Sequence, residues 1–571
     1  MKRIPYGISD FKQVRREGLY YVDKTMFLPV MEDEAHFLFL VRPRRFGKSV
    51  FLSMMRAYYD INERDNFNTL FDGLWIQQHP TELHNSFEVL HLDFSQIGGH
   101  IDDLSKNFSS YLGIMIESFA RRYAHLYPKG YYEDVCRIPI ADGKLNYINE
   151  AAKTYGHRMY LIVDEYDNFT NDVLNVKGEA VYRALTHGEG FYRDVFKKFK
   201  GNFDRILMMG VSPVTMDDVT SGYNIASNIT MKPQFNQMLG FSETDVREMI
   251  RYYQGEEVLK ADEEALVEEM KPWYDNYCFA EDAVYSDPKM FNCDMVLYYV
   301  KNVIQTGKSP TDMIDVNTRT DYSKMRKLIQ LDQLDGNRRG LLNQIAQDGG
   351  ITEALVPSFP ARDMALPENF VSLLFYYGML TIGGVFGAKQ KLIIPNNNVR
   401  KHYYDYLLRQ YQEIATIDIR ALSNAYDQAA INGDWQSMVK EIADVYQKTT
   451  SVRQLIEGER NLQGFMNAYL TLNPYYLTAP ELELNHGYCD FFLMPDLKRY
   501  PMIAHSYILE LKYLKQEDTE TVAERQWQEA TDQILEYAQA PIVQKMTEGT
   551  RLHLLILQIR GCEMVRVEEV S

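Results

Sequence analysis

The feature that most constrains the fold of this chain is a short apolar run that leads into a Gly-Lys-Ser tripeptide. Residues 36–41 read His-Phe-Leu-Phe-Leu-Val, which is typical of a buried strand, and apolar residues then recur at helical spacing from Phe51 to Tyr58. The loop between them is basic and ends in Gly-Lys-Ser at residues 47–49. In such a position, backbone N–H groups at the start of the helix hold phosphates. The pattern predicts a phosphate-binding loop in an α/β domain.

The loop itself supplies most of the expected nucleotide contacts. Lys48 can reach the β and γ oxygens of a nucleotide, and the Ser49 hydroxyl can ligate Mg²⁺. The first glycine of the usual pattern is missing, because Arg42 stands in its place. Since a Gly-Lys-Ser tripeptide alone is also found in ordinary surface turns, the prediction needs a second motif. The residues expected to bind the nucleotide in this loop are Arg44, Arg45, Phe46, Gly47, Lys48 and Ser49.

The second motif follows a strand expected at residues 159–163. Asp164 and Glu165 come directly after this apolar run, where an NTPase carries its acidic residues. We expect Asp164 to bind the nucleotide and its Mg²⁺ opposite Ser49, and Glu165 to act as the catalytic base that orients and deprotonates the attacking water. Adjacent acids after a strand can also form a solvated loop, but the two motifs together predict nucleotide binding.

Two further contacts of the γ-phosphate are expected. Ser212, at the end of a strand expected at residues 206–211, is the candidate for sensing this phosphate, although a strand-end cap would have the same sequence. Efficient hydrolysis also needs an arginine, because the transition state spreads negative charge over the γ-phosphoryl oxygens. The sequence leaves open whether one of four arginines has this role or whether they form surface ion pairs: Arg44, Arg45, Arg183 and Arg193.

A second group of polar residues lies near the C-terminus, on expected strands at residues 487–493 and 506–512. Alternation places Glu510 and Lys512 on one face of their strand, and a hairpin would bring them to Asp490. Two carboxylates that hold Mg²⁺ or Mn²⁺ beside a lysine can activate water for phosphodiester hydrolysis. A half-exposed strand with alternating charges is the alternative interpretation.

Composition limits the partners and the compartment. The chain has 61 Lys and Arg against 79 Asp and Glu, a net charge of −18, so any contact with DNA must be local and salt-sensitive. Five scattered cysteines without a CxxC pair suit a reducing cytoplasm, and the apolar runs stop short of the ~18 residues of a membrane helix. We therefore expect a cytoplasmic protein that does not enter the membrane. Basic residues near the second site could contact DNA, or could be ordinary surface charge: Lys498, Arg499, Lys512, Lys515 and Arg525.

Several longer motifs in the first half of the chain are shared with a known family. They are Ile-Pro-Tyr-Gly at 4–7, Ser-Asp-Phe at 9–11, Tyr-Val-Asp-Lys-Thr at 21–25, Arg-Pro-Arg-Arg-Phe-Gly-Lys-Ser at 42–49, Asp-Glu-Tyr-Asp at 164–167, Gly-Phe-Tyr at 190–192, Ser-Gly-Tyr-Asn at 221–224 and Trp-Tyr-Asp-Asn-Tyr-Cys-Phe at 273–279. On these residues the chain resembles the bacterial AAA-ATPase-like family, in which the first loop glycine is also missing. The resemblance implies ATP as ligand and places residues 23–25 near it, either at the base or as packing. Met209 and Asn276 depart from the expected Thr and Gly.

The C-terminal residues resemble the PD-(D/E)xK nuclease fold, in particular the nuclease domain that accompanies this ATPase family. The resemblance implies that Asp490 and Glu510 are catalytic metal ligands and that Lys512 is the catalytic lysine. It adds Glu483, or as a weaker choice Glu481, as an upstream metal ligand, and Gln533 as a supporting residue. The expected Gly-Arg-x-Asp reads Gly-Tyr-Cys-Asp at 487–490, which removes one phosphate contact.

The whole chain is therefore expected to be an α/β multidomain protein. We expect a P-loop AAA-ATPase-like domain with a parallel sheet at 1–235 and a helical lid and winged-helix-like region at 236–400. A helical connector at 401–445 and a restriction-endonuclease-like PD-(D/E)xK domain at 446–571 follow. The 571 residues are enough for three or four domains.

Three functions remain open on these grounds. The first is an ATP-binding and ATP-hydrolysing protein that regulates a C-terminal Mg²⁺- or Mn²⁺-dependent nuclease acting on DNA, in defence or DNA processing. The second is a nucleotide-dependent switch that binds DNA or a partner and has an inactive nuclease-like domain. A remodelling motor is the third, although no repeated ATPase unit supports it. The oligomeric state, including a homo-oligomer, is left open.

Overall fold

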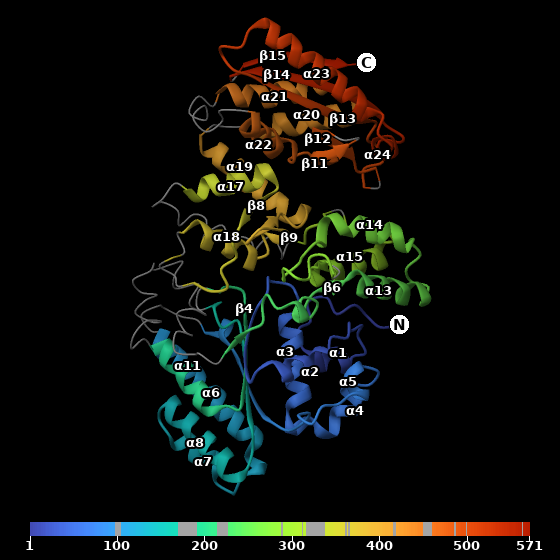
Figure 1. Ribbon diagram of the computed structural model, residues 1–571. Coiled ribbons are helices and arrows are strands. Elements are labelled where there is room, and N and C mark those ends of the chain that lie inside the picture. The colour runs from blue at the N-terminus through green and yellow to red at the C-terminus, as the bar shows by residue number, and fades with distance from the viewer. Residues whose placement is uncertain are drawn as a thin grey trace. The chain divides into compact units, whose positions relative to one another are not determined.

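The computed structural model describes the chain except for residues 98–103, 169–190, 214–225, 287–288, 311, 316–336, 360–362, 364–365, 415–417, 449–458, 485–486, 498, 562 and 571. The described residues form two compact units, one of Met1–Leu341 with Gly350–Val399 and one of Leu342–Gly349 with Arg400–Ser571 (Figure 1). Each unit has its own five-stranded sheet and its own apolar core. The four-domain division expected from the sequence stays a prediction.

The centre of the first unit is a parallel sheet with the order β2-β3-β4-β1-β5. Its longer strands are rich in Val, Leu, Ile and Met and are buried, as is typical of a parallel sheet that is covered on both faces. Because β4 pairs with both β1 and β3, the loops that follow these three strands meet at one edge. The expected parallel α/β fold is confirmed. The strands are β1 (Phe37–Val41), β2 (Glu88–Asp93), β3 (Met159–Asp164), β4 (Arg205–Gly210) and β5 (Ser227–Asn228).

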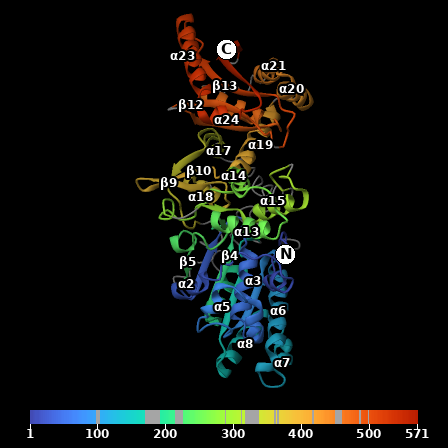
Figure 2. The ribbon, with the colours of Figure 1, turned by 90° about the vertical axis from the view of Figure 1, so that its right-hand side faces the viewer.

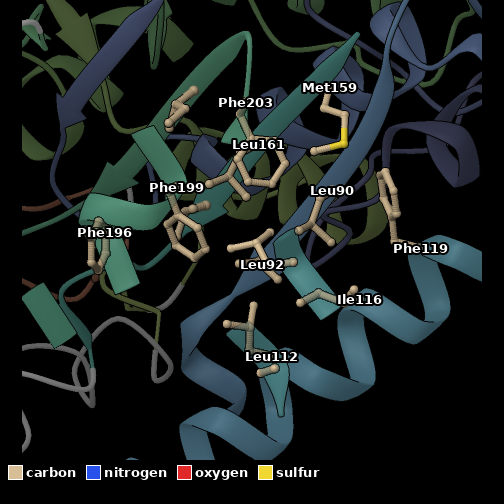
Figure 3. Packing of buried hydrophobic residues seen from close by; sticks show 14 of the residues in the cluster. Leu90, Leu92, Leu112, Ile116, Phe119, Met159, Leu161, Phe196, Phe199 and Phe203 are labelled. Carbon is tan, nitrogen blue, oxygen red and sulfur yellow. The ribbon is translucent and has the colours of Figure 1, made fainter. Parts of the chain in front are cut away.

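Helices cover both faces of this sheet. On one face, apolar residues of α6 and α11 pack against Leu90 and Leu92 of β2 and Leu161 of β3 (Figure 3). On the other face lies α3, whose Tyr59 ring contacts Tyr160, the strand neighbour of Leu161 that points the opposite way. Helices α6, α7 and α8 lie side by side (Figure 2). The helices are α1 (Phe11–Arg16), α2 (Phe27–Glu34), α3 (Lys48–Tyr59), α4 (Phe67–Leu70), α5 (Trp75–Gln78), α6 (Leu104–Tyr123), α7 (Tyr131–Arg137), α8 (Ala141–Tyr155) and α11 (Phe191–Asn202).

Three helices of the same unit form a second apolar cluster beyond residue 240. Ser242 caps α13: its hydroxyl accepts from the Asp245 N–H, and the Asp245 carboxylate accepts from the Ser242 N–H at 2.7 Å. Val246, Met249 and Ile250 then face the cluster. The elements are β6 (Phe241–Ser242), α13 (Glu243–Gly255), α14 (Glu263–Tyr274), β7 (Met290–Phe291) and α15 (Cys293–Thr306).

Residues 350–399 combine one helix with a three-stranded antiparallel sheet. The sheet has the order β8-β10-β9, and α18 precedes the β9–β10 hairpin. Every residue of α18 from Asn369 to Tyr376 is buried, so this stretch offers no exposed face that could enter a DNA groove. The winged-helix assignment stays a prediction. The elements are β8 (Gly350–Glu353), α18 (Pro367–Tyr376), β9 (Thr381–Phe386) and β10 (Lys389–Ile393).

The second unit is built on a mixed sheet with the order β11-β12-β13-β14-β15. Only β13 and β14 pair in parallel, and α23 makes the crossover between them. Trp527, Ala530 and Ile534 of α23 pack on Phe492 and Ile508 of the sheet. The elements are α17 (Asn337–Asp348), α19 (Asn397–Ile414), α20 (Ile419–Asn432), α21 (Trp435–Lys448), α22 (Glu459–Leu470), β11 (Tyr476–Leu484), β12 (Gly487–Pro495), β13 (His505–Leu514), α23 (Glu520–Ala538), α24 (Pro541–Met546), β14 (Arg551–Arg560) and β15 (Glu563–Val570), with the ends of α17 and α19 shared with the first unit. In the parts of the chain that are described, no helix has both the length and the apolar surface that crossing a membrane requires.

Candidate functional site

The phosphate-binding loop opens into a cavity of about 420 Å³ in the first unit. All six loop residues expected to bind the nucleotide line it, together with Glu165. Further walls come from segments far away in the sequence, at residues 5–9, 20–24 and 238–241 and at the start of α15. The cavity therefore lies between the parallel sheet, the N-terminal segment and the helices beyond residue 240.

The loop has the backbone and the charge that phosphate binding requires. Gly47 has φ +83° and precedes α3, so the chain turns there in a conformation that favours glycine. The N–H groups of the first turn of α3 have no carbonyl partner within the helix. Lys48 is buried, and its ammonium donates to the carbonyls of Arg42 and Pro43 at 3.0 and 2.8 Å. Burial lowers the pKa of Lys48, against an opposing effect of Asp164 and Glu165. The ammonium of Lys48 could therefore bind an anion that enters the loop.

The acidic motif after β3 lies at the same edge. The Ser49 hydroxyl donates to Asp164 Oδ2 at 2.7 Å, and the N–H of Glu165 donates to Asp164 Oδ1 at 2.9 Å. Burial is the main reason that the pKa values of both carboxyl groups are raised. Ser49 and Asp164 thus present two oxygen ligands of the kind Mg²⁺ prefers, and Glu165 lines the cavity where a base for the attacking water is needed.

Ser212 lies at the end of β4, but its described contacts are structural. Its N–H donates to Asp167 Oδ2 at 2.7 Å, and its carbonyl accepts from the Tyr166 hydroxyl at 2.9 Å. These bonds tie the end of β4 to the loop after β3. A Cβ on Gly210 would come within 2.3 Å of Asp167 Oδ1 and 2.6 Å of the Tyr166 ring. Ser212 is not among the described residues that line the cavity, so phosphate sensing by Ser212 stays a prediction.

Arg42, which replaces the first loop glycine, supports the loop through buried hydrogen bonds. Its side chain is fully buried, and the guanidinium donates to the carbonyls of Val41, Thr230 and Phe235 at 2.7–3.0 Å. It also lies 4.3 Å from the centre of the Phe279 ring. Burial lowers the pKa of Arg42 to about 9. These contacts give the arginine a structural reason to be in the loop.

The four arginines considered for hydrolysis are placed very differently. Arg45 forms an ion pair with Asp294 of α15 at 2.8 Å. Arg44 lines the cavity with Glu165 and is the largest electrostatic influence that lowers the pKa of that carboxyl. Arg183 and the side chain of Arg193 lie outside the described residues. Of these four arginines, Arg44 is the one that the structure links electrostatically to the expected base.

Three residues at this site were missed or left open by the sequence. Asp93, at the end of β2, pairs in register with Asp164 and raises the pKa of that carboxyl. Lys24 lines the cavity and binds Asp245 at 2.7 Å, whereas Asp23 accepts from the N–H groups of Thr25 and Trp75. Residues 23–25 therefore combine packing with one cavity side chain. The apolar end of β2 before Asp93 was the one local signal available.

In the second unit, the two strands expected to carry the metal ligands separate at the site. The ladder between β12 and β13 ends at the Phe491–Leu509 pair, and the next donor, the Leu511 N–H, binds Asp490 Oδ2 at 2.7 Å. Glu510 is almost fully buried and accepts from Lys512 Nζ at 2.9 Å. Lys512 Nζ also donates to Gln533 of α23 at 3.2 Å. The structure thus brings Glu510, Lys512 and Gln533 into contact and places Asp490 on the neighbouring strand.

Two other residues belong to this group. Gln463 of α22, which no sequence pattern indicated, donates through Nε2 to Asp490 Oδ1. The only local signal would have been a polar residue between the buried Leu462 and Phe465. Burial, followed by the charges of Glu510, Cys489 and Asp490, raises the pKa of Tyr537 to about 12, so this hydroxyl stays protonated. The side chains of Glu481 and Glu483 lie outside the described residues, although β11 places Glu483 opposite Tyr488.

The donor set fits a hard divalent cation better than a soft one. Asp490 and Glu510 offer carboxylate oxygens, and Gln463 and Gln533 can offer amide oxygens. Within the described ranges, no three His, Cys, Asp or Glu side chains lie close enough together to hold a metal ion. The described carboxylates alone therefore do not complete a coordination sphere.

Comparison with known proteins assigns a family to two segments of the chain. Residues 5–220 match the family model described as Predicted AAA-ATPase, and residues 457–569 match that of the PD-(D/E)XK nuclease superfamily. Both expected domain families are confirmed. A protein of Azotobacter chroococcum mcd 1, described as an uncharacterized protein in the vnfD 5' region, is 27% identical over 447 residues, which is 75% of this chain and 74% of that protein.

The departures from the AAA-ATPase-like pattern have local explanations. Asn276 has φ +80°, a left-handed conformation that asparagine tolerates better than most residues, so it can replace the usual glycine. Met209 is fully buried in β4, next to Leu40 of β1. In the PD-(D/E)XK domain, the loss of the arginine at position 488 leaves Asp490, Glu510 and Lys512 in place.

Proposed function

We propose that this protein binds and hydrolyses ATP with Mg²⁺ and thereby regulates a C-terminal nuclease that uses Mg²⁺ or Mn²⁺ to cut DNA. A cytoplasmic role in defence against foreign DNA or in DNA processing would follow. The single observation that carries the proposal is that one chain contains two polar sites. Ser49 contacts Asp164 in the AAA-ATPase-like domain, and Lys512 contacts Glu510 in the PD-(D/E)XK domain.

Support for ATP hydrolysis comes from the complementary parts of the first site. Lys48 would bind the phosphates, and Ser49 and Asp164 would hold Mg²⁺. Glu165 has a raised pKa because it is buried, which makes it a stronger base than an exposed carboxylate. Arg44 would stabilise charge on the γ-phosphoryl group from within the same loop.

Support for DNA cleavage comes from the second site. Asp490 and Glu510 would hold the cation, which supplies Lewis acidity and an activated water when bound. Lys512 is held by Glu510 and Gln533, so its ammonium is fixed where it can stabilise a developing phosphate charge. Gln533 thus positions the lysine.

Contact with DNA would be weak and local. Of the basic residues considered for this role, Arg499 pairs with Asp496 at 3.3 Å, and Lys498 lies outside the described residues. Lys515 is exposed near the end of β13, and Arg525 lies on α23. With a net charge of −18 on the chain, we expect binding to fall steeply as salt increases.

The test is cleavage of supercoiled and linear DNA by the full-length protein with Mg²⁺ or Mn²⁺, with and without ATP. Asp490→Ala should abolish cleavage, and Lys48→Ala should abolish only its response to ATP. If neither DNA nor RNA is cut under any of these conditions while ATP still binds, the nuclease part of the proposal is wrong.

The alternative, a nucleotide switch with an inactive nuclease-like domain, is favoured by two observations. The described part of the site has two carboxylates, and position 488 is Tyr where the family pattern has Arg. Under this alternative, Mn²⁺ binding would not depend on Asp490 and Glu510.

A further inference from the structure

Helix α22 carries polar side chains on a face that is turned into the protein. Leu462, Phe465 and Met466 are almost fully buried, so the helix is held firmly in the second unit. The side chain of Gln347 packs closely against this helix, within 3.0 Å of where a Cβ on Gly464 would lie. The amide side chains Gln463 and Asn467 stand one turn apart on this helix, which places them on the same face.

The amide of Gln463 faces one of the two expected metal ligands. Its Nε2 donates to Asp490 Oδ1, and the Leu511 N–H donates to Asp490 Oδ2. Both oxygens of this carboxylate therefore accept a hydrogen bond from the protein. A cation bound to Asp490 would have to share or replace the contact with Gln463, because the Leu511 N–H is fixed in the backbone of β13.

A second amide on the same face has an oxygen that needs a partner. Asn467 is 4% exposed, and its Oδ1 is buried without a hydrogen-bond donor among the described residues. A buried polar oxygen without a donor is rare in native proteins and often marks the place of a water or an ion. The buried face of α22 thus has more acceptor capacity than the described protein groups use.

A divalent cation at this site would need a further oxygen ligand, and an uncharged amide oxygen would be suitable. Mg²⁺ and Mn²⁺ take about six oxygen ligands, of which proteins usually supply one or two carboxylates, and amide oxygens are also good ligands. A half turn of the Gln463 side-chain amide about its last bond exchanges nitrogen and oxygen. The same side chain can therefore donate to a bare carboxylate or offer Oε1 to a cation.

We propose that Gln463 is an amide-oxygen ligand of the divalent cation held by Asp490 and Glu510. The inference rests on the proposed metal-dependent nuclease and assigns to that site a ligand from a separate helix. Gln463 donates to Asp490 when no cation is bound and turns its oxygen towards the cation when one is present. As a neutral ligand, it adds no third negative charge to the site.

The test measures Mn²⁺ binding to the full-length protein without nucleotide. Binding is measured by calorimetry and by the electron paramagnetic resonance signal of free Mn²⁺. Every variant carries Asp164→Asn, so that Mn²⁺ in the first unit does not contribute. Gln463→Ala should weaken binding about 10- to 100-fold, as loss of a metal-site contact commonly does. Gln463→Glu should bind at least as tightly as the parent. Gln528→Ala, an exposed glutamine on α23, is the control and should change nothing.

The glutamate variant separates a ligand from a mere hydrogen-bond donor, because loss of a hydrogen bond to a metal ligand can also weaken metal binding. If Gln463 only donated to Asp490, Gln463→Glu, whose carboxylate cannot donate, would bind Mn²⁺ more weakly than the parent, and this would overturn the inference. Should Asp490→Ala still abolish binding in that case, the proposed nuclease site would stand without Gln463. Absence of Mn²⁺ binding by the parent protein would overturn both.

Discussion

The Ser49 hydroxyl donates a 2.7 Å hydrogen bond to Asp164 Oδ2 across 115 residues of sequence. The contact forms because β1 and β3 are parallel strands of one sheet, so the loops after them meet at the same edge. The bond joins the two groups that would share a Mg²⁺ ion.

Asp164→Asn should therefore remove the part of ATP affinity that depends on Mg²⁺. The amide keeps the shape and the contact with Ser49 but loses the negative charge. We expect calorimetry to show tighter ATP binding with Mg²⁺ than with EDTA for the parent protein, and equal binding under both conditions for the variant. Lys48→Ala should weaken binding in both conditions by roughly 10- to 100-fold, because a buried cation that contacts phosphate is lost. A variant Asp164→Asn that keeps its full response to Mg²⁺ would contradict the assignment.

Gly210→Ala should destabilise the protein by about 1–3 kcal/mol, as overpacking of a tight site does. The new methyl group would lie 2.3 Å from Asp167 Oδ1 and 2.6 Å from the Tyr166 ring, both of which hold the loop after β3. Urea unfolding measures the loss. Gly201→Ala is the matched control, since no atom lies within 4 Å of its added Cβ. Equal stability of the two variants would show that the loop can move aside.

Arg42→Gly restores the usual glycine of the motif, yet we expect it to destabilise the protein by roughly 3 kcal/mol. The substitution leaves the carbonyls of Val41, Thr230 and Phe235 without their buried donor. Arg42→Lys should recover only part of the loss, because an ammonium cannot span the same acceptors as a guanidinium. Thermal unfolding of the parent protein and the two variants ranks their stabilities. A glycine variant as stable as the parent would refute the supporting role of Arg42.

The parts of the fold that the sequence predicted are those written in local patterns. The apolar run at 36–41, the helical spacing after it and the alternation around Glu510 each lie within about ten residues, so periodicity alone reveals them. The capping box of Ser242 and Asp245 is another local pattern of this kind. The family resemblances then assigned chemistry to the same positions.

The residues that the sequence could not reveal are joined by long-range contacts. Arg45 meets Asp294 across 249 residues, and Arg42 binds carbonyls 188 and 193 residues away. No local pattern marks such partners, because the sheet and the helices beyond residue 240 bring them together. Gln463 was missed for the same reason, since a single polar residue in a helix has no signature until the neighbouring strand is known.

A buried carboxyl at the opposite end of β2 should make stability depend on pH. Burial raises the pKa of Glu88 to about 7, with an opposing hydrogen bond from Tyr127. Because the folded pKa lies above the unfolded value, this group stabilises the fold fully below about pH 4 and loses that contribution as the pH rises through 7. Glu88→Gln should not show this loss. We therefore expect the free energy of unfolding of the variant, relative to the parent protein, to be higher at pH 8 than at pH 5 by up to roughly 3 kcal/mol. Urea unfolding at the two pH values measures this difference. The exposed Glu82→Gln should show no such difference between the two pH values.

Lys512→Ala should separate metal binding from cleavage. The ammonium contacts Glu510 and Gln533 but lies outside the expected cation ligands, so Mn²⁺ affinity should be kept or rise slightly when this positive charge is removed. Cleavage should fall about 100-fold or more, because a fixed cation no longer stabilises the charge that develops on the phosphate. Lys515→Ala is the matched control: it removes an exposed lysine three residues further on, and should weaken DNA binding in a salt-dependent way with little effect on cleavage at low salt. If Lys512→Ala and Lys515→Ala reduced cleavage equally and a lower salt concentration restored both, Lys512 would act as a backbone contact for DNA and not in the chemical step.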